Sequence, residues 1–187
     1  MLTHRRFLCW LLVGFLVTFA NAAAVENEKA LRYHELLLKR PDSQMIFTRF
    51  YDEWLTSASI AELEQFLLAE AKAGEAGDWH VLAVYYLERG EEARALEAFR
   101  SATELAPEAG GLWLSRAKSA KAMQDYEQAL KNLKRALACE LQAPQVLEAR
   151  RLQGSCLALS GRIEEAEQVW GGLLEDFPDD HELMEDL

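Results

Sequence analysis

The chain has 187 residues, of which 50% are hydrophobic and 27% charged, and its formal net charge is −11. This length is sufficient for one domain with a sizeable apolar core. The excess of acidic side chains repels phosphate backbones and anionic lipids, so it disfavours nucleic acids and membrane surfaces as partners.

Residues 1–22 have the layout of a secretory signal peptide. A positive start ends at Arg6, an apolar run covers residues 7–19, and residues 20–22 (Ala-Asn-Ala) match the small-x-small cleavage pattern. The apolar run has about 13 residues, fewer than the roughly 20 that span a bilayer. We therefore expect an exported protein, periplasmic or secreted, without a membrane span after cleavage. An uncleaved N-terminal anchor is the alternative, because the run reaches about 19 residues if it is extended to Val25.

Residues 23–75 are predicted to contain a single unpaired helix followed by a degenerate helix pair. The single helix covers residues 28–39 and ends before Pro41. The first helix of the pair starts near Gln44, and the second runs from Ile60 to Ala71 after a turn at residues 57–59. Aromatic residues recur at helical spacing in the first of these two helices, at Phe47, Phe50, Tyr51 and Trp54.

A period of 34 residues follows, and it predicts stacked helix pairs over residues 76–109 and 110–146. A third unit, residues 147–180, has Gly154 where the earlier units have a small residue, and residues 181–187 begin a further or truncated helix. Small residues at fixed places let two helices cross closely, while larger ones fill the gaps beside them. Trp79, Ala83, Ala95, Phe99 and Ala102 are matched 34 positions later by Trp113, Ala117, Ala129, Leu133 and Ala136.

Two departures from the regular pattern need an explanation. Pro144 lies three residues later than the period requires, so we expect the helix through Ala138 to be longer by nearly one turn. Gly171 and Gly172 lie inside the last predicted helix, where each costs about 1 kcal/mol relative to alanine. Either this helix frays there or another element packs closely against it.

The unit at residues 76–109 resembles the tetratricopeptide repeat (TPR), which has a Trp-Leu-Gly-Tyr helix, an Ala-Phe helix and a terminal proline. The resemblance implies an all-α fold, a right-handed superhelical solenoid of antiparallel helix pairs. It also implies a non-catalytic scaffold that binds a protein or peptide segment in a concave groove. The matching residues are Trp79, Leu82, Tyr86, Ala95, Phe99, Ala102 and Pro107, with Ala83 in the place of the usual glycine.

The resemblance further implies which side chains face the groove. They include four basic residues and no acidic one, which suits a partner with acidic groups or a free C-terminus. A plainer interpretation is that these bases only balance neighbouring acids, and the asparagine of the family's carboxylate-clamp subset is missing. The expected groove residues are Arg49, His80, Val84, Leu87, Leu114, Lys118, Lys121, Arg151 and Ser155.

The sequence contains no recognisable catalytic, cofactor or metal motif, so neither an enzyme nor a cofactor is expected. The isolated histidines (His34, His80 and His181) are predicted to lie at the surface or in the groove, and the tryptophans in the core. Cys139 and Cys156 are predicted to be free thiols, because Cys156 lies about 18 Å along its helix, too far for a disulfide. We expect Cys156 to be packed like a small apolar residue. The tryptophans predicted to lie in the core are Trp54, Trp79, Trp113 and Trp170.

Two other functions remain open at this point. The chain could be a structural subunit that forms oligomers through an uncovered final repeat. It could also be the N-terminal, non-catalytic part of a longer cell-envelope enzyme.

Overall fold

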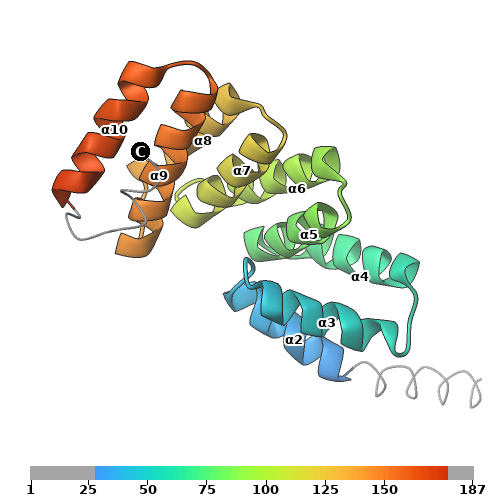
Figure 1. Cartoon of the computed structure of the whole chain (residues 1–187). Helices are drawn as coiled ribbons and strands as arrows, with labels where there is room; N and C mark the ends of the chain where they lie inside the picture. The colour runs from blue at the N-terminus through green and yellow to red at the C-terminus, as the bar shows by residue number, and fades with distance from the viewer. Residues whose placement is uncertain (1–27, 177–187) are drawn as a thin grey trace, which may run out of the picture. The chain divides into compact units, whose positions relative to one another are not determined.

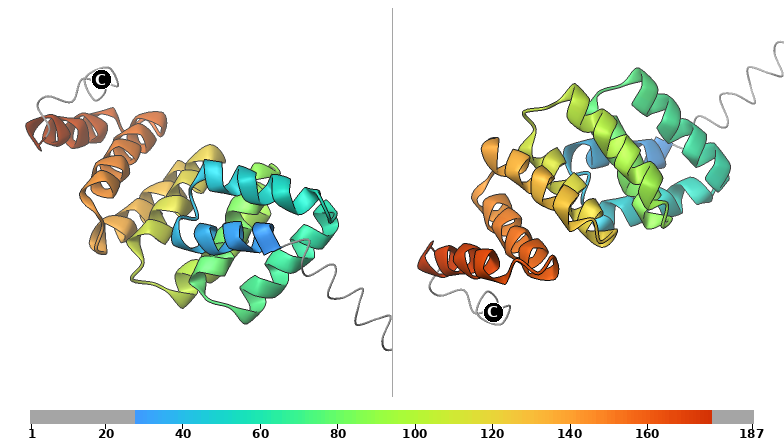
Figure 2. Two further views of the ribbon diagram at one scale, coloured as in Figure 1. Left: turned by 90° about the horizontal axis from the view of Figure 1, so that it is seen from below. Right: turned by 90° about the horizontal axis from the view of Figure 1, so that it is seen from above.

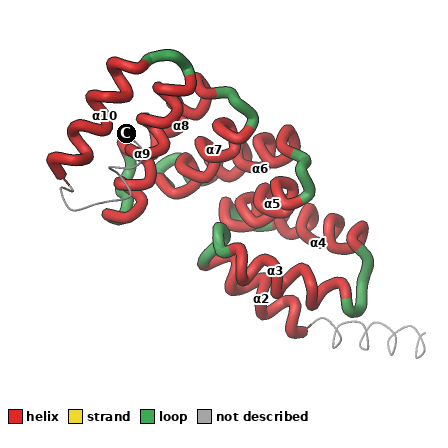
Figure 3. Tube along the Cα trace, viewed as in Figure 1, coloured by secondary structure: helices red, strands yellow, loops and turns green. Residues whose placement is uncertain are grey.

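The computed structural model describes residues 28–176, and this part of the chain consists of helices joined by short loops (Figures 1 and 3). The predicted leader and the predicted start of a final helix at residues 181–187 lie outside it. The chain divides into two compact units, residues 1–69 and 70–187, and the boundary falls inside α4. The helices are α2 (Glu28–Lys39), α3 (Gln44–Leu55), α4 (Ile60–Ala73), α5 (Ala76–Glu88), α6 (Glu92–Leu105), α7 (Gly110–Ala122), α8 (Tyr126–Ala138), α9 (Ala143–Leu159) and α10 (Ile163–Asp176).

In the first unit, α2 packs against α3, so the prediction that residues 28–39 form an unpaired helix is wrong. Lys29, near the start of α2, forms an ion pair with Glu53, near the end of α3, which shows that the two helices are antiparallel. The His34 ring lies 5.7 Å from Phe50 of α3 and 5.2 Å from Phe66 of α4, measured between centroids. His34 is therefore a buried residue of the aromatic core, not the surface histidine that we expected.

The described part of the second unit contains three helix pairs, α5 with α6, α7 with α8, and α9 with α10. Figure 2 shows from two sides that the members of each pair run side by side. Small residues stand where the helices pack, and their burial explains the 34-residue period because only a small side chain permits a close crossing. Examples with no exposed surface are Ala83, Ala95, Ala102, Ala117, Ala129, Ala136 and Ala166.

The turn inside each pair has the same backbone geometry. A residue with positive φ occupies the turn each time: Gly90 at 68°, Gln124 at 61° and Gly161 at 82°. The next amide N–H donates to a carbonyl five residues back, as in a Schellman C-cap, at 2.8–2.9 Å. Gly90 and Gln124 are 34 residues apart, whereas Gln124 and Gly161 are 37 apart, so three additional residues lie between the second and third turns.

Those additional residues are in the link between α8 and α9, not in a longer α8. The helix ends at Ala138, and Cys139 is extended, with φ −96° and ψ 168°. The expected extra helical turn is therefore absent. Leu141 of the link packs so tightly on Gly110 that a Cβ there would lie 2.7 Å from Leu141 Cδ2. Cys139 and Cys156 are free thiols, as predicted, and Cys156 is fully buried.

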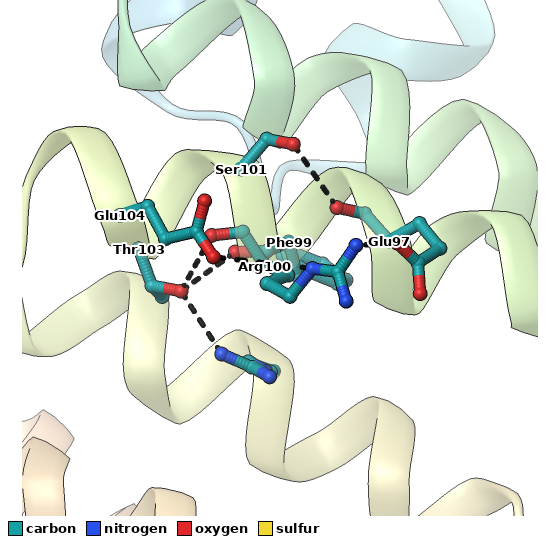
Figure 4. A network of polar contacts seen from close by, with 7 residues as sticks. Glu97, Phe99, Arg100, Ser101, Thr103 and Glu104 are labelled. Carbon is teal, nitrogen blue, oxygen red and sulfur yellow. Dashed lines mark hydrogen bonds and ion pairs between the residues drawn. The ribbon is translucent and has the colours of Figure 1, made fainter.

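A polar network joins α6 to α7 (Figure 4). The Arg116 guanidinium donates to Thr103 Oγ1 at 3.0 Å, and this hydroxyl donates to the Phe99 carbonyl at 3.0 Å. The same guanidinium lies 5.5 Å from the Trp113 ring centroid. Burial lowers the pKa of Arg116, and the nearby positive charge of Arg100 lowers it further. Thr103 is therefore a hydrogen-bond acceptor for a charge that is partly removed from water.

The last helix contains two glycines that the structure does not require. α10 continues unbroken from Ile163 to Asp176, and among the described residues nothing lies within 4 Å of a Cβ placed on Gly171 or Gly172. Neither fraying nor close packing explains them. Gly154 of α9 is different, because a Cβ there would lie 2.2 Å from Trp170 Nε1.

These glycines give a first prediction. Gly154→Ala should destabilise the protein by about 1–3 kcal/mol, because the added methyl collides with the Trp170 ring. Gly171→Ala should stabilise it by up to about 1 kcal/mol through helix propensity. Urea unfolding of both variants measures the difference, and a Gly154→Ala variant as stable as Gly171→Ala would contradict the proposed close packing.

The α6–α7 network gives a second prediction. Thr103→Val should cost about 1–3 kcal/mol, because it removes the acceptor of a partly buried guanidinium. Ser101→Ala, which removes only a 3.3 Å bond to the Glu97 carbonyl, serves as the matched control and should change stability by less than about 0.5 kcal/mol. Equal thermal midpoints for the two variants would show that the Arg116–Thr103 bond contributes nothing.

Candidate functional site

A groove of about 800 Å³ lies in the second unit, between α7 and α9, and one residue of α10 reaches it. Its α9 residues are spaced three or four apart, which places them on one face of the helix. Those from α7 are likewise three apart. The groove is lined by Lys118, Lys121, Pro144, Leu147, Glu148, Arg151, Leu152, Ser155, Ala158, Leu159 and Trp170.

Three cations and one acid give the groove its charge. Lys118 of α7 forms an ion pair with Glu148 of α9 at 2.6 Å. No carboxylate within residues 28–176 pairs with Lys121. Arg151 lies on the opposite wall and supplies a planar guanidinium, which can hold a carboxylate with two parallel hydrogen bonds. The net excess of positive charge makes the groove unlike the acidic chain as a whole.

The apolar part of the groove comes from α9 and α10. Leu159 is 55% exposed, and Leu147, Leu152 and Trp170 are partly exposed. Trp170 reaches the groove beside Gly154, where any larger residue would occupy the place of its indole ring. Exposed leucines next to cations fit a ligand that carries both aliphatic and carboxylate groups.

Cys156 lies beneath this surface and takes no part in it. Its side chain is fully buried in the cluster that contains Leu114, Ala117 and Ala149. Burial raises the pKa of the thiol, and the positive charge of Lys121 opposes this shift. The thiol is therefore protonated at neutral pH and acts as a packing residue.

The structure brings four of the nine predicted groove residues together: Lys118, Lys121, Arg151 and Ser155. It differs at His80, Val84 and Leu114, whose side chains are only 4%, 9% and 2% exposed. These three cannot present a contact surface as expected, because neighbouring side chains cover them. The His80 ring, for example, packs 5.4 Å from that of Phe99.

The remaining two predicted residues lie elsewhere. Leu87 is half-buried and does not line the groove, and Arg49 is an exposed residue of the first unit. The sequence interpretation missed Glu148, Leu147, Leu152, Leu159 and Trp170. Helical spacing from Arg151 could have indicated the residues of α9, because positions three or four away share its face. No comparable signal marked Trp170.

The tryptophans divide into two kinds. Trp54 is buried, as predicted. Trp79, Trp113 and Trp170 are only partly buried, which corrects the prediction that they belong to the core. Trp113 Nε1 donates to the Pro107 carbonyl at 2.8 Å, and the guanidinium groups of Arg116 and Arg135 lie over its ring.

Residues 28–176 contain no group of three side chains placed to hold a metal ion. The same residues include no helix with the length and hydropathy that crossing a membrane requires.

Comparison with known proteins identifies one repeat within the chain. The tetratricopeptide repeat model matches residues 79–108, which form most of α5 and α6. The chain therefore contains a tetratricopeptide repeat at these residues. No curated protein sequence matches it. Solved structures that resemble it include TPR proteins, and they share its all-α solenoid architecture of helix pairs.

Three of these structures resemble the chain in fold but have low sequence identity to it. A TPR protein from Parabacteroides merdae has a TM-score of 0.60 and 17% identity, over 89% of this chain and 71% of that one. YrrB, described as a TPR protein with an unusual peptide-binding site, has a TM-score of 0.55 and 19% identity, over 82% and 79%. The second TPR domain of human RPAP3, solved with the HSP70 peptide SGPTIEEVD, has a TM-score of 0.50 and 18% identity, over 66% and 94%. Identities this low establish the fold alone.

The burial of Cys156 gives a third prediction. In the folded protein at pH 8, a thiol reagent should modify half-buried Cys139 at least about 100-fold faster than Cys156, because the latter is covered and its pKa is raised. Mass spectrometry of alkylated peptides measures both rates in one sample, and denaturant should abolish the difference. Equal rates in the native state would contradict the packing beneath the groove.

Proposed function

We propose that this TPR protein is an exported, non-catalytic scaffold that binds a protein or peptide segment in the groove formed by α7, α9 and α10. The bound segment carries carboxylate groups next to aliphatic side chains. Export rests on residues 1–22, which have the pattern of a signal peptide. The preference for carboxylates rests on the groove itself.

The observation that carries the proposal is the gathering of Lys118, Lys121 and Arg151 in one groove of a protein with net charge −11. Among the described residues, Glu148 is the only acid that lines the groove, and it pairs with Lys118. Lys121, which no carboxylate of residues 28–176 neutralises, is accordingly assigned to the partner's carboxylates. Arg151 lines the same groove with a guanidinium whose planar shape fits a carboxylate.

The two walls suggest how a segment lies in the groove. α9 has 17 residues and is about 25 Å long, which accommodates about seven residues of extended peptide. Carboxylates would meet Arg151 and Lys121, while aliphatic side chains would cover Leu159 and Trp170. Peptide binding by the fold is supported by YrrB and by the RPAP3 domain, whose bound peptide contains two glutamates and an aspartate.

Charge reversal tests this proposal. Extended peptides selected from a random library on the purified protein should be enriched in Asp and Glu and should bind at least about tenfold more weakly to Lys121→Glu and Arg151→Glu variants. The Lys131→Glu and Lys134→Glu variants carry the same charge change on α8, outside the groove, and should retain binding. Selected peptides without acidic residues, or equal loss in both pairs of variants, would overturn the proposal.

A further inference from the structure

The sequence that follows α10 combines acidic and apolar residues, which is the combination that the proposed groove binds. Residues 177–187 contain no lysine or arginine. Three apolar residues (Leu183, Met184 and Leu187) stand among the acids. The five acidic residues are Asp179, Asp180, Glu182, Glu185 and Asp186. We propose that this acidic segment occupies the groove of its own chain and must be displaced by any other partner; this inference rests on the proposed function.

Charge complementarity is the first argument. The segment carries five negative charges, and the groove offers Lys121, which no carboxylate of residues 28–176 neutralises. Bringing the two together offsets like-charge repulsion among the acids, which are otherwise crowded into eight positions. The apolar residues match as well, because Leu159 and Trp170 leave apolar surface in the groove.

The second argument is that the segment is long enough to extend along the groove from the end of α10. α10 ends at Asp176, whose carboxylate accepts a hydrogen bond from Arg150 of α9 at 2.7 Å. Arg150 is the sequence neighbour of Arg151, so the chain leaves α10 beside the helix that forms one wall of the groove. Eleven extended residues span about 36 Å, whereas the 17 residues of α9 span about 25 Å. The segment is therefore long enough to follow the whole wall.

The segment in the groove belongs to the same chain and not to a second copy, because it is covalently attached close to the groove. A short flexible connection gives a tethered ligand an effective concentration of the order of 1 mM. A second copy at micromolar concentration cannot compete with this. The acidic segment thus raises the affinity that a partner needs, and partners with more or better placed carboxylates are favoured over weakly acidic ones.

The experiment compares the full chain with a tail-neutralised variant, in which the five acids of the segment become Asn or Gln (D179N, D180N, E182Q, E185Q and D186N). The probe is a fluorescein-labelled peptide with the sequence of residues 177–187, added in trans and followed by anisotropy. The tail-neutralised variant should bind this peptide about tenfold more tightly than the wild-type chain, because its own segment no longer competes. Lys121→Glu in the same background should abolish the gain, and circular dichroism confirms that each variant is folded.

Other outcomes separate the two proposals. Equal binding of the peptide by both proteins, with loss on Lys121→Glu, would overturn self-occupancy and leave the groove's preference for acidic segments intact. Binding by neither protein would also overturn it, and the library selection would then decide the proposed function alone. A mass that doubles with concentration in sedimentation, for the wild type and not for the tail-neutralised variant, would assign the segment to a second copy and overturn occupancy within one chain.

Discussion

The close crossing of two helices at a small residue is the constraint on which the second unit depends. Ala83, Ala117 and Gly154 hold this position in the first helix of successive pairs, and all three are buried. Each allows the second helix of its pair to approach, so large side chains nearby can fill the remaining space. At Gly154 this approach has a consequence for the surface, because it lets the Trp170 ring reach the groove. Packing thereby supplies part of the groove's apolar surface.

The charge of the groove follows from the same geometry. Since α7 and α9 are the first helices of neighbouring pairs, residues at the same place in each pair form adjacent walls. Lys118 and Lys121 therefore face Glu148 and Arg151 across a gap that neither helix could form alone. A groove of this kind recognises a ligand by the spacing of its charges, because the helices that carry the cations are fixed by the core.

Most of the helices could be predicted from the sequence, and the reason is local. The 34-residue period and the spacing of aromatic residues depend on a single chain segment at a time, and the turns at Gly90 and Gln124 lie one period apart. The path of the link between α8 and α9 could not be predicted in this way. Whether three additional residues extend a helix or form a loop depends on the contact between Leu141 and Gly110, which are far apart in the sequence.

The candidate site was predictable only in part, for a similar reason. The inward-facing helix positions of the TPR family include Lys118, Lys121, Arg151 and Ser155, which line one groove in the structure. The same set of positions includes His80 and Leu114, which neighbouring side chains cover. The burial of a side chain depends on the size of residues on other helices, and its position within the repeat does not show this. Trp170 was assigned to the core because its position is a packing position. Its exposure depends on the absence of a side chain at Gly154.

The central claim is that the groove of α7 and α9 binds carboxylate-bearing segments, and backbone amide chemical shifts measure this most directly. During titration of the labelled protein with an acidic peptide, we expect the largest shifts at Lys121, Arg151 and Ser155, with little change at Leu130 and Lys134, which do not line the groove. A high salt concentration should weaken the response, because the attraction is electrostatic. Shifts concentrated on α8, or no shift in the groove at saturating peptide, would contradict the account.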